Sequence, residues 1–389
     1  MELYIPRFFK APNNSYFLFG PRGTGKSTFL KHDYPEALWI DLLKPDVFRT
    51  YVSHPERIIE LVRGNPEKNI IIVDEIQKVP EILSAVHSLI EEKSGKAFIL
   101  TGSSARKLKK AGINLLAGRV LLRTLHPFLL AELTVDVAFD GVLQFGLLPI
   151  VIFADDPADV LNAYVSLYIR EEVQLEGLVR NIGNFSRFLE AVSFSHASLL
   201  NISNVARECN VERKVVESYI QILEDILIAF RLQVFSKRAQ RKLVAHPKFY
   251  FFDSGVFQNL RPKGPLDRPE EIGGAALEGL VGQSLRAWNA YRNHPYELFF
   301  WRSRSGVEVD FVLYGETGIY AIEVKNSNRI RPEDLRSLNE FQKDYPQSQT
   351  ILLYRGDEKL LLNKILCIPC EQFLKALSPR VDFSSFFAH

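Results

Sequence analysis

The stretch of sequence that decides the fold of the first third of the chain is Gly20-Pro21-Arg22-Gly23-Thr24-Gly25-Lys26-Ser27. It follows a strand-like apolar run at residues 16–19 and precedes a segment with helical periodicity. Glycines in such a loop let backbone N–H groups turn inward around phosphates, and the N-terminus of the next helix favours an anion. We expect Lys26 to reach the β- and γ-phosphates and Ser27 to ligate Mg²⁺. The spacing predicts a phosphate-binding loop, the P-loop, made of Gly20, Pro21, Arg22, Gly23, Thr24, Gly25, Lys26, Ser27 and Thr28.

A second signature lies about fifty positions further on. Ile70-Ile71-Ile72-Val73-Asp74-Glu75 is an apolar run that ends in two carboxylates. We expect Asp74 to hold the magnesium through water and Glu75 to polarise the attacking water. A glycine-rich turn that binds nothing is the plain alternative for the loop, but it leaves these carboxylates unexplained.

Two further candidates accompany these signatures. The strand predicted at residues 97–101 ends in Gly102-Ser103-Ser104. Ser103, with Ser104 as the next choice, is expected beside Asp74 and Glu75, where it would orient the lytic water. A helix N-cap is the other interpretation. Arg119 would stabilise transition-state charge in a neighbouring subunit, or else form a surface ion pair.

With these motifs, the first third resembles an AAA-type ATPase, with residues 17–27 as Walker A, 70–77 as Walker B and 100–104 as the sensor segment. Nearly the whole chain is similar to a prokaryotic group in which this module precedes a winged helix and a nuclease-like domain. The resemblance implies ATP and Mg²⁺ as ligands and a homo-oligomeric ring such as a hexamer. It also implies a lid arginine that senses nucleotide, for which Arg170, Arg180 and Arg187 remain alternatives.

The middle of the chain predicts a helical lid at 136–192 and a winged helix-turn-helix at 193–260. Six basic residues and no acidic ones lie between positions 231 and 248: Arg231, Lys237, Arg238, Arg241, Lys242 and Lys248. Lys237, Arg238, Arg241 and Lys242 would lie at the tip of the wing, and Arg213 and Lys214 near the start of the recognition helix. Clustered cations of this kind favour phosphate contacts, so DNA is the predicted partner. A protein–protein module with a solvated wing is the alternative.

The tail carries a third set of polar residues. Asp310 lies on one predicted strand, and Glu323 and Lys325 lie two positions apart on the next, so all three are expected at one sheet edge. Two carboxylates can hold Mg²⁺ and a lysine can stabilise the reacting phosphate, while Glu278, on the preceding helix, would complete the metal shell. This segment resembles the PD-(D/E)XK nuclease superfamily, with Glu278, Asp310, Glu323 and Lys325 on its four motif positions. A surface Glu–Lys pair, or a domain that kept only binding, is the alternative.

The composition is that of an ordinary globular protein: 389 residues, 47% hydrophobic, with a formal net charge of +2. Cys367 and Cys370 form a Cys-x-x-Cys pair without two further soft ligands at a matching spacing, which favours two part-buried thiols over zinc. No signal peptide or membrane span is expected, and a soluble cytoplasmic protein is the default.

The predicted fold class is α/β, with a P-loop AAA-type parallel sheet, a helical lid, a winged helix-turn-helix and a C-terminal α/β nuclease-like domain. The predicted boundaries are 1–135, 136–192, 193–260 and 261–389. The leading hypothesis is an ATP-hydrolysing, DNA-associated ATPase. A metal-dependent endonuclease regulated by ATP and a nucleotide-switched protein-interaction module are the alternatives.

Overall fold

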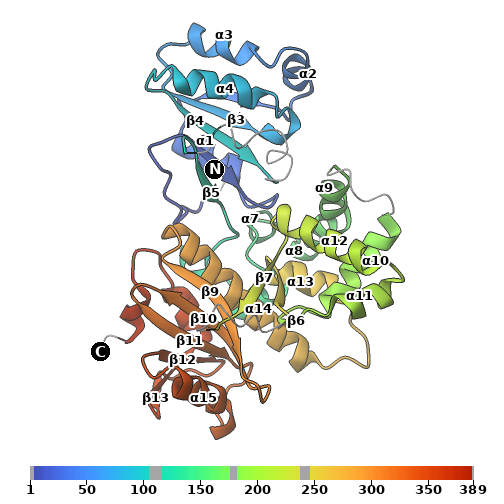
Figure 1. Cartoon of the computed structure of the whole chain (residues 1–389), viewed down its shortest axis with the longest axis vertical. Helices are drawn as coiled ribbons and strands as arrows, with labels where there is room; N and C mark the ends of the chain where they lie inside the picture. Colours follow the sequence, from blue (N-terminus) through green and yellow to red (C-terminus); the bar gives the residue numbers. More distant parts are fainter. Residues whose placement is uncertain (1–3, 105–115, 117, 176–181, 237–245, 388–389) are drawn as a thin grey trace.

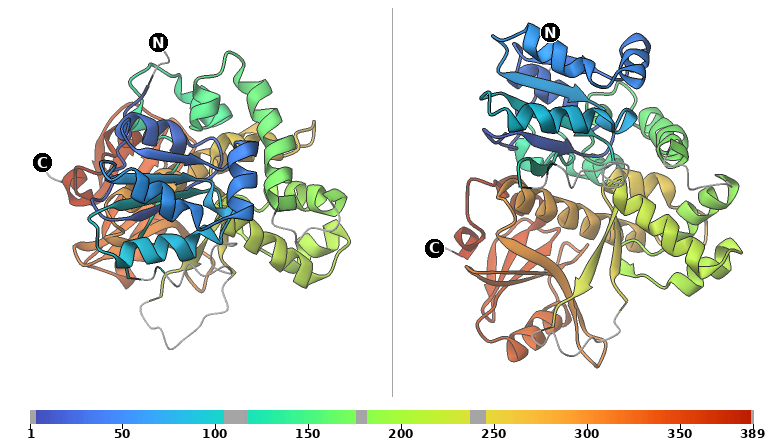
Figure 2. Two further views of the ribbon diagram at one scale, coloured as in Figure 1. Left: turned by 90° about the horizontal axis from the view of Figure 1, so that it is seen from above. Right: turned by 45° about the horizontal axis from the view of Figure 1, so that its top comes forward.

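The computed structural model describes residues 4–104, 116, 118–175, 182–236 and 246–387. The N-terminal part forms one body at the top of Figure 1, and the middle and C-terminal parts lie below it. Seen from above, in the left panel of Figure 2, the green lid segment runs along one side of the blue N-terminal part.

The N-terminal part is built on a parallel five-stranded sheet with the order β2-β3-β4-β1-β5. Its strands are β1 (Tyr16–Phe19), β2 (Leu38–Asp41), β3 (Ile70–Asp74), β4 (Ala97–Gly102) and β5 (Leu121–Thr124). The strands predicted at residues 16–19 and 97–101 are β1 and β4, to within a residue, and the apolar run that starts at Ile70 is β3. Since all five strands run the same way, the ends of β1, β3 and β4 that carry the motifs lie at one edge of the sheet.

Helices cover both faces of this sheet, as alternating strands and helices predict. They are α1 (Lys26–Asp33), α2 (Pro45–Ser53), α3 (Arg57–Gly64), the 3₁₀ turn η1 (Ile76–Lys78) and α4 (Ile82–Glu91). Successive strand residues point to opposite faces, so Phe17 packs with the side of α3 and α4, and Tyr16 and Leu18 pack with the side of α1.

The segment predicted as a lid is helical. After the 3₁₀ turn η3 (Leu130–Glu132) come α6 (Phe139–Phe145), α7 (Pro149–Ile152), α8 (Pro157–Ala163), the π-helical η4 (Tyr164–Tyr168), α9 (Ile169–Leu175) and α10 (Ile182–Ser193). None of the helices in the described ranges is both long and apolar enough to cross a membrane.

A helix-turn-helix follows the lid. Its elements are β6 (Ser198–Leu199), α11 (Ile202–Cys209), α12 (Arg213–Asp225), β7 (Ala229–Val234), β8 (Lys248–Phe251) and α13 (Ser254–Leu260). Asn201 caps α11, because its side chain accepts a hydrogen bond from the N–H of Asn204 at 3.1 Å. Asn210 makes the turn in the left-handed conformation, which asparagine tolerates better than most residues.

The C-terminal part begins with the long helix α14 (Pro269–Tyr291). The remaining elements are β9 (Tyr296–Arg302), β10 (Glu308–Gly315), β11 (Gly318–Val324), η5 (Pro332–Leu335), α15 (Arg336–Asp344), β12 (Gln349–Tyr354), β13 (Leu360–Leu362), β14 (Ile365–Pro369), α16 (Cys370–Ala376) and η6 (Phe383–Phe387). The strands predicted to carry Asp310 and Glu323 are β10 and β11, and the helix predicted to carry Glu278 is α14.

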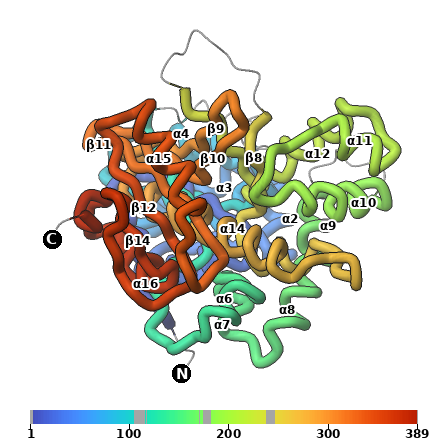
Figure 3. Tube along the Cα trace, turned by 90° about the horizontal axis from the view of Figure 1, so that it is seen from below, coloured from blue at the N-terminus to red at the C-terminus, as the bar shows by residue number. Residues whose placement is uncertain are grey.

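Strands from both sides of the predicted boundary at 260/261 belong to one sheet. β7 pairs with β9 in parallel, which joins the hairpin of the helix-turn-helix to the C-terminal strands. The resulting nine-stranded sheet has the order β13-β14-β12-β11-β10-β9-β7-β8-β6. From below, in Figure 3, α14 lies between the helix-turn-helix segment and the strands of the tail.

Candidate functional site

The P-loop connects β1 to α1 at the edge of the parallel sheet. Gly23 and Gly25 adopt φ angles of 81° and 85°, a region that residues with a Cβ rarely occupy. These two glycines therefore allow the backbone turn that brings the chain into α1 at Lys26.

Lys26 is buried at the base of this loop, with 6% of its surface exposed. Its ammonium donates to the carbonyl oxygen of Gly20 at 2.7 Å and to that of Pro21 at 3.2 Å. Burial lowers the pKa of Lys26, although the nearby Glu75 and Asp74 oppose that effect. The ammonium is held by neutral backbone oxygens, which an incoming phosphate can replace.

Ser27 and Asp74 come together across the sheet edge. The Ser27 hydroxyl donates to Asp74 Oδ2 at 2.8 Å, and the Thr101 hydroxyl donates to Asp74 Oδ1. A hydroxyl and a carboxylate are hard oxygen ligands, and Mg²⁺ usually takes only one or two such groups from a protein together with substrate phosphates. These two residues therefore fit a nucleotide-bound magnesium.

Glu75 follows β3 in the left-handed conformation, with φ of 60°. Its backbone N–H donates to Thr101 Oγ1 at 3.0 Å, and its side chain accepts from the amide of Gln77. The same amide donates to Ser103 Oγ at 3.1 Å, so the structure places Ser103 in one network with Glu75. Burial raises the pKa of Glu75, and Lys26 opposes that shift.

Lid residues lie directly on the P-loop. The Tyr164 hydroxyl donates to the carbonyl oxygen of Arg22 at 2.9 Å, and a Cβ added at Gly23 would meet Ile150 Cγ2 at 2.9 Å. Ser103 Oγ also donates to Glu172 Oε2 on α9 at 2.9 Å. The cavity between the loop, Ser103 and these lid helices is only about 10 Å³.

The sequence placed Gln77 and Thr101 inside the predicted motifs without a role of their own, and it missed Glu172 and Arg7. Thr101 and Gln77 are close in sequence to predicted residues, so the motif context could have indicated their roles. Glu172 carries no such signal, because only the fold of the lid brings it to Ser103.

Arg7 links the P-loop to the tail. Its buried guanidinium donates to the carbonyl oxygen of Thr24 at 2.9 Å and to the hydroxyl of Tyr291, on α14, at 3.2 Å. It also pairs with the buried carboxylate of Glu132 at 3.3 Å. One side chain thus connects the nucleotide loop, the start of the lid and the C-terminal part.

The predicted arginines have different outcomes. Arg119 pairs with Glu91 of the same chain on an exposed surface, which matches the ion-pair alternative; its role across a subunit interface stays a prediction. Arg187 is exposed on α10. Burial raises the pKa of Cys209 in the helix-turn-helix, and the positive charge of Arg187 opposes that shift. Arg180 and the side chain of Arg170 lie outside the described residues.

The DNA-binding candidates are only partly described. Arg213 and Lys214 are exposed at the start of α12, where Arg213 pairs with Glu217 at 2.9 Å. The four wing-tip residues fall in the range 237–245, outside the described residues: Lys237, Arg238, Arg241 and Lys242.

The structure brings the predicted tail residues together. Asp310 Oδ2 accepts from the N–H of Val324, at 2.9 Å, on the strand that carries Glu323. Glu323 Oε1 accepts from Lys325 Nζ at 2.5 Å, while its Oε2 is buried without a hydrogen-bond partner. Burial and the charge of Asp310 raise the pKa of Glu323 to about 8.

Lys248 also belongs to this cluster, although the sequence placed it only among the basic residues of the wing. Its Nζ lies 3.0 Å from Glu278 Oε1 and 3.0 Å from Asp310 Oδ1. Burial and Asp310 raise the pKa of Glu278 to about 7. Across the described residues, no group of three or more His, Cys, Asp or Glu side chains is arranged to hold a metal ion.

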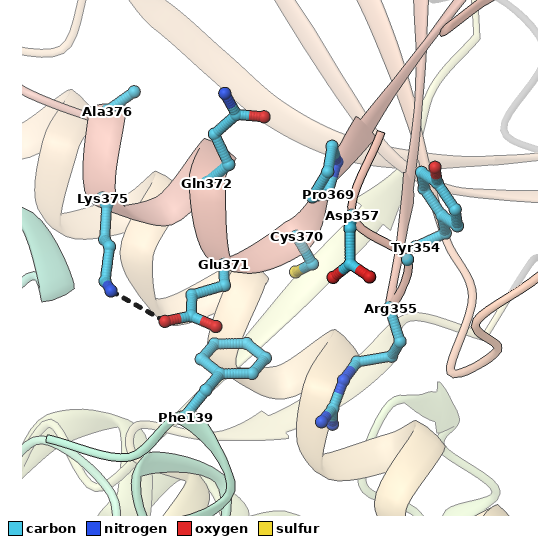
Figure 4. A pocket seen from close by; sticks show the side chains of 11 residues that line it. Phe139, Tyr354, Arg355, Asp357, Pro369, Cys370, Glu371, Gln372, Lys375 and Ala376 are labelled. Atoms are coloured by element: carbon cyan, nitrogen blue, oxygen red, sulfur yellow. Dashed lines mark ion pairs between the residues drawn. The ribbon is translucent and has the colours of Figure 1, made fainter. Parts of the chain in front are cut away.

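A polar cavity of about 720 Å³ lies elsewhere, beside α16 (Figure 4). Lys375 pairs with Glu371 on its wall at 2.7 Å, and Arg355 pairs with Asp140 at 2.6 Å. Cys370 lines it, but this thiol and Cys367 are fully buried rather than part-buried. Burial raises the pKa of Cys370 to about 12, so it stays a thiol at neutral pH and lacks the character of a reactive cysteine.

Three family models match consecutive parts of the chain. Residues 12–134, which contain the P-loop, Asp74, Glu75 and the parallel sheet, match a model described as an AAA domain. Residues 12–134 form an AAA-type P-loop domain. Residues 138–267 and 273–373 match two domains of unknown function, DUF8612 and DUF4143. The first of these models covers both the lid and the helix-turn-helix. No curated protein matches the chain.

Solved structures are similar to the chain only distantly. DnaA from Aquifex aeolicus bound to AMPPCP is 14% identical, with a TM-score of 0.29, over 54% of this chain and 81% of that one. A replication initiator DnaA bound to AMPPCP and single-stranded DNA is 12% identical, with a TM-score of 0.27, over 56% and 83%. A protein from Vibrio cholerae is 10% identical, with a TM-score of 0.22, over 94% and 96%. The family match is therefore what assigns the AAA domain.

Proposed function

We propose that the AAA domain binds ATP with Mg²⁺ at the P-loop and hydrolyses it. The observation that carries this proposal is the convergence of Lys26, Ser27, Asp74 and Glu75 at one edge of the parallel sheet. They supply a cation for phosphate, oxygen ligands for magnesium and a carboxylate for water activation, which together are the requirements of nucleotide hydrolysis.

The residues divide the work as follows. Lys26 leaves the carbonyl oxygens of Gly20 and Pro21 and binds the β- and γ-phosphates. Ser27 and Asp74 would hold Mg²⁺, which supplies neutralisation of charge on the phosphates. Glu75 accepts a proton from the attacking water, and burial, which raises its pKa, makes it a better proton acceptor. The Gln77 amide donates to the Glu75 carboxylate and holds it in position, and the same amide donates to Ser103 Oγ.

Nucleotide binding would change the contacts of the lid. Tyr164 and Glu172 of the lid contact Arg22 of the P-loop and Ser103 directly, at 2.9 Å each. Glu172 also adds a negative charge close to Lys26 and Glu75. ATP binding is therefore coupled to the contacts of the lid, which is how the domain would transmit its nucleotide state to the rest of the chain.

The test is ATP turnover and nucleotide affinity of the full chain with Mg²⁺. We expect ATP hydrolysis that EDTA removes, and loss of nucleotide binding in Lys26→Ala. An active Lys26→Ala variant with unchanged affinity would rule out the P-loop as the site.

DNA is a second candidate ligand, for the helix-turn-helix. The exposed Arg213 and Lys214 at the start of α12 favour it, because residues at the start of a recognition helix meet the groove. A gel shift at low salt that weakens in Arg213→Ala/Lys214→Ala would support DNA binding. No shift and no change in ATP turnover with duplex DNA would favour the nucleotide-switched protein-interaction module instead.

Two further predictions need their own experiments. A ring of subunits, with Arg119 acting in a neighbour, predicts a larger mass in solution with ATP than without it. An endonuclease at Asp310, Glu323 and Lys325 predicts plasmid nicking with Mg²⁺ or Mn²⁺ that Asp310→Ala abolishes and Lys26→Ala does not.

A further inference from the structure

Lys248 is the first residue of β8, and its side chain enters the carboxylate cluster of the tail. Only 3% of this side chain is exposed. Its nitrogen lies 3.0 Å from Glu278 Oε1, 3.0 Å from Asp310 Oδ1 and 3.8 Å from Glu308 Oε2. An ammonium at these distances makes charge-assisted hydrogen bonds to the first two carboxylates.

These oxygens are the ones that a divalent cation would need. Asp310 Oδ1 accepts a hydrogen bond from Lys248 Nζ, and Asp310 Oδ2 accepts one from the N–H of Val324. Glu278 Oε1 accepts from Lys248 and also from the hydroxyl of Tyr250 at 2.7 Å. The Asp310 carboxylate and this Glu278 oxygen therefore already have donors, and Glu323 Oε2 is the buried oxygen of the cluster that has none among the described residues. One free oxygen does not supply the ligand set that a divalent metal in a nuclease-like site requires.

The charges of the cluster support the same conclusion. Four carboxylates, Glu278, Glu308, Asp310 and Glu323, are paired with three cations, Lys248, Arg302 and Lys325. Arg302 forms an ion pair with Glu308 at 2.7 Å, and Lys325 forms one with Glu323. Lys248 is therefore the cation that pairs with both Glu278 and Asp310. Without Lys248, these two carboxylates would carry two uncompensated negative charges, which a divalent ion would match.

We infer that Lys248 is the resident cation of this cluster and keeps a divalent metal ion out of it. Glu278 lies on α14 and Asp310 on β10, so the ammonium joins the hairpin of the helix-turn-helix to the helix and the central strand of the tail. The nuclease-like constellation then serves as a buried ion-pair junction between two segments of the nine-stranded sheet. This inference does not depend on ATP binding by the AAA domain.

The experiment is a Mn²⁺ titration of the nucleotide-free full chain, followed by electron paramagnetic resonance of the free ion. In the wild type, we expect the same Mn²⁺ binding as in Asp310→Asn up to about 1 mM. In Lys248→Met, whose side chain has a similar length but no charge, we expect one additional bound Mn²⁺ per chain. The double variant Lys248→Met/Asp310→Asn should lose that ion again.

Two results would overturn the inference. One is Mn²⁺ bound by the wild type that Asp310→Asn removes, since the metal would then share the cluster with Lys248. The other is a folded Lys248→Met that binds no more Mn²⁺ than the wild type. If Lys248→Met does not fold, Lys248→Gln, which keeps a hydrogen-bond donor, replaces it. The comparison of the wild type with Asp310→Asn needs no Lys248 variant, and it decides by itself whether the wild-type cluster binds Mn²⁺.

Discussion

Lys26 and Lys248 are the buried lysines of the described residues, and they differ in which groups accept their hydrogen bonds. Lys26 in the P-loop donates to backbone carbonyl oxygens of its own loop, whereas Lys248 donates directly to Glu278 and Asp310. Burial lowers the pKa of Lys26 despite nearby acids. For Lys248 burial acts in the same direction, but Glu278, Tyr250 and Asp310 raise the pKa well above its ordinary value.

This difference shows how a similar set of residue types can serve opposite purposes. An ammonium on neutral oxygens can exchange them for phosphate, because no buried anion is left without a partner when it moves. If an ammonium between two buried carboxylates leaves, both carboxylates stay buried without a counter-charge, which costs much free energy. The first site is open to a ligand, and the second is a structural junction.

The largest expected effect is on catalysis at the first site. Glu75→Gln should lower ATP turnover by about 1,000-fold while ATP still binds, because the general base is lost and the loop remains. The measurement is steady-state hydrolysis together with the dissociation constant for a fluorescent ATP analogue. Glu81→Gln, the same change at an exposed position nearby, is the matched control and should behave as wild type. Equal turnover by Glu75→Gln and Glu81→Gln would remove Glu75 from its assigned role.

The next effect concerns stability at the second site. Lys248→Met should destabilise the chain by about 3 kcal/mol, since it leaves Glu278 and Asp310 buried without a counter-charge. Urea unfolding followed by tryptophan fluorescence measures this change. Lys343→Met, on the exposed face of α15, is the control and should change little. Adding Glu278→Gln to Lys248→Met should restore part of the loss, and an unfolding midpoint equal to that of Lys343→Met would show that the junction contributes nothing.

A smaller effect is expected from the lid acid next to the first site. Glu172→Gln should bind ATP about tenfold more tightly, close to 1.4 kcal/mol, because it removes a negative charge that would face the phosphates. Calorimetry with ATP and Mg²⁺ measures the change. Glu171→Gln alters a neighbouring carboxylate that is 56% exposed and should have less effect. If both variants strengthen binding equally, overall charge rather than the contact of Glu172 with Ser103 is responsible.

The smallest expected effect is a difference between Lys26 and Lys248 in their reactivity toward an acylating reagent. Since burial lowers the pKa of Lys26 and the neighbouring acids raise that of Lys248, a larger fraction of Lys26 than of Lys248 is the reactive free amine at alkaline pH. Brief treatment with acetic anhydride should modify Lys26 about threefold more than Lys248, and ATP should protect Lys26 alone. Peptide mass spectrometry gives both extents in one sample. Preferential labelling of Lys248 would reverse the comparison between the two sites.

The two sites also differ in how far the sequence predicts them. The P-loop, Asp74 and Glu75 are local motifs on strands whose ends must meet in a parallel sheet, so their convergence follows from the pattern. Strand alternation also predicted that Asp310, Glu323 and Lys325 lie together, and Glu278 was expected to join them from the preceding helix, but Lys248 was not predicted there. Its position depends on the parallel pairing of β7 with β9, a contact between segments about sixty-six residues apart that no local pattern encodes. Glu172 was missed for the same reason, because the path of the lid places it on Ser103.

The most direct test of the account is isothermal titration of the full chain with ATP and Mg²⁺, compared with Lys26→Ala. The account predicts that the wild type binds one ATP per chain and that the variant binds none under the same conditions. No heat of binding from folded wild-type protein, or equal affinity in the variant, would contradict the assignment of the P-loop as the nucleotide site.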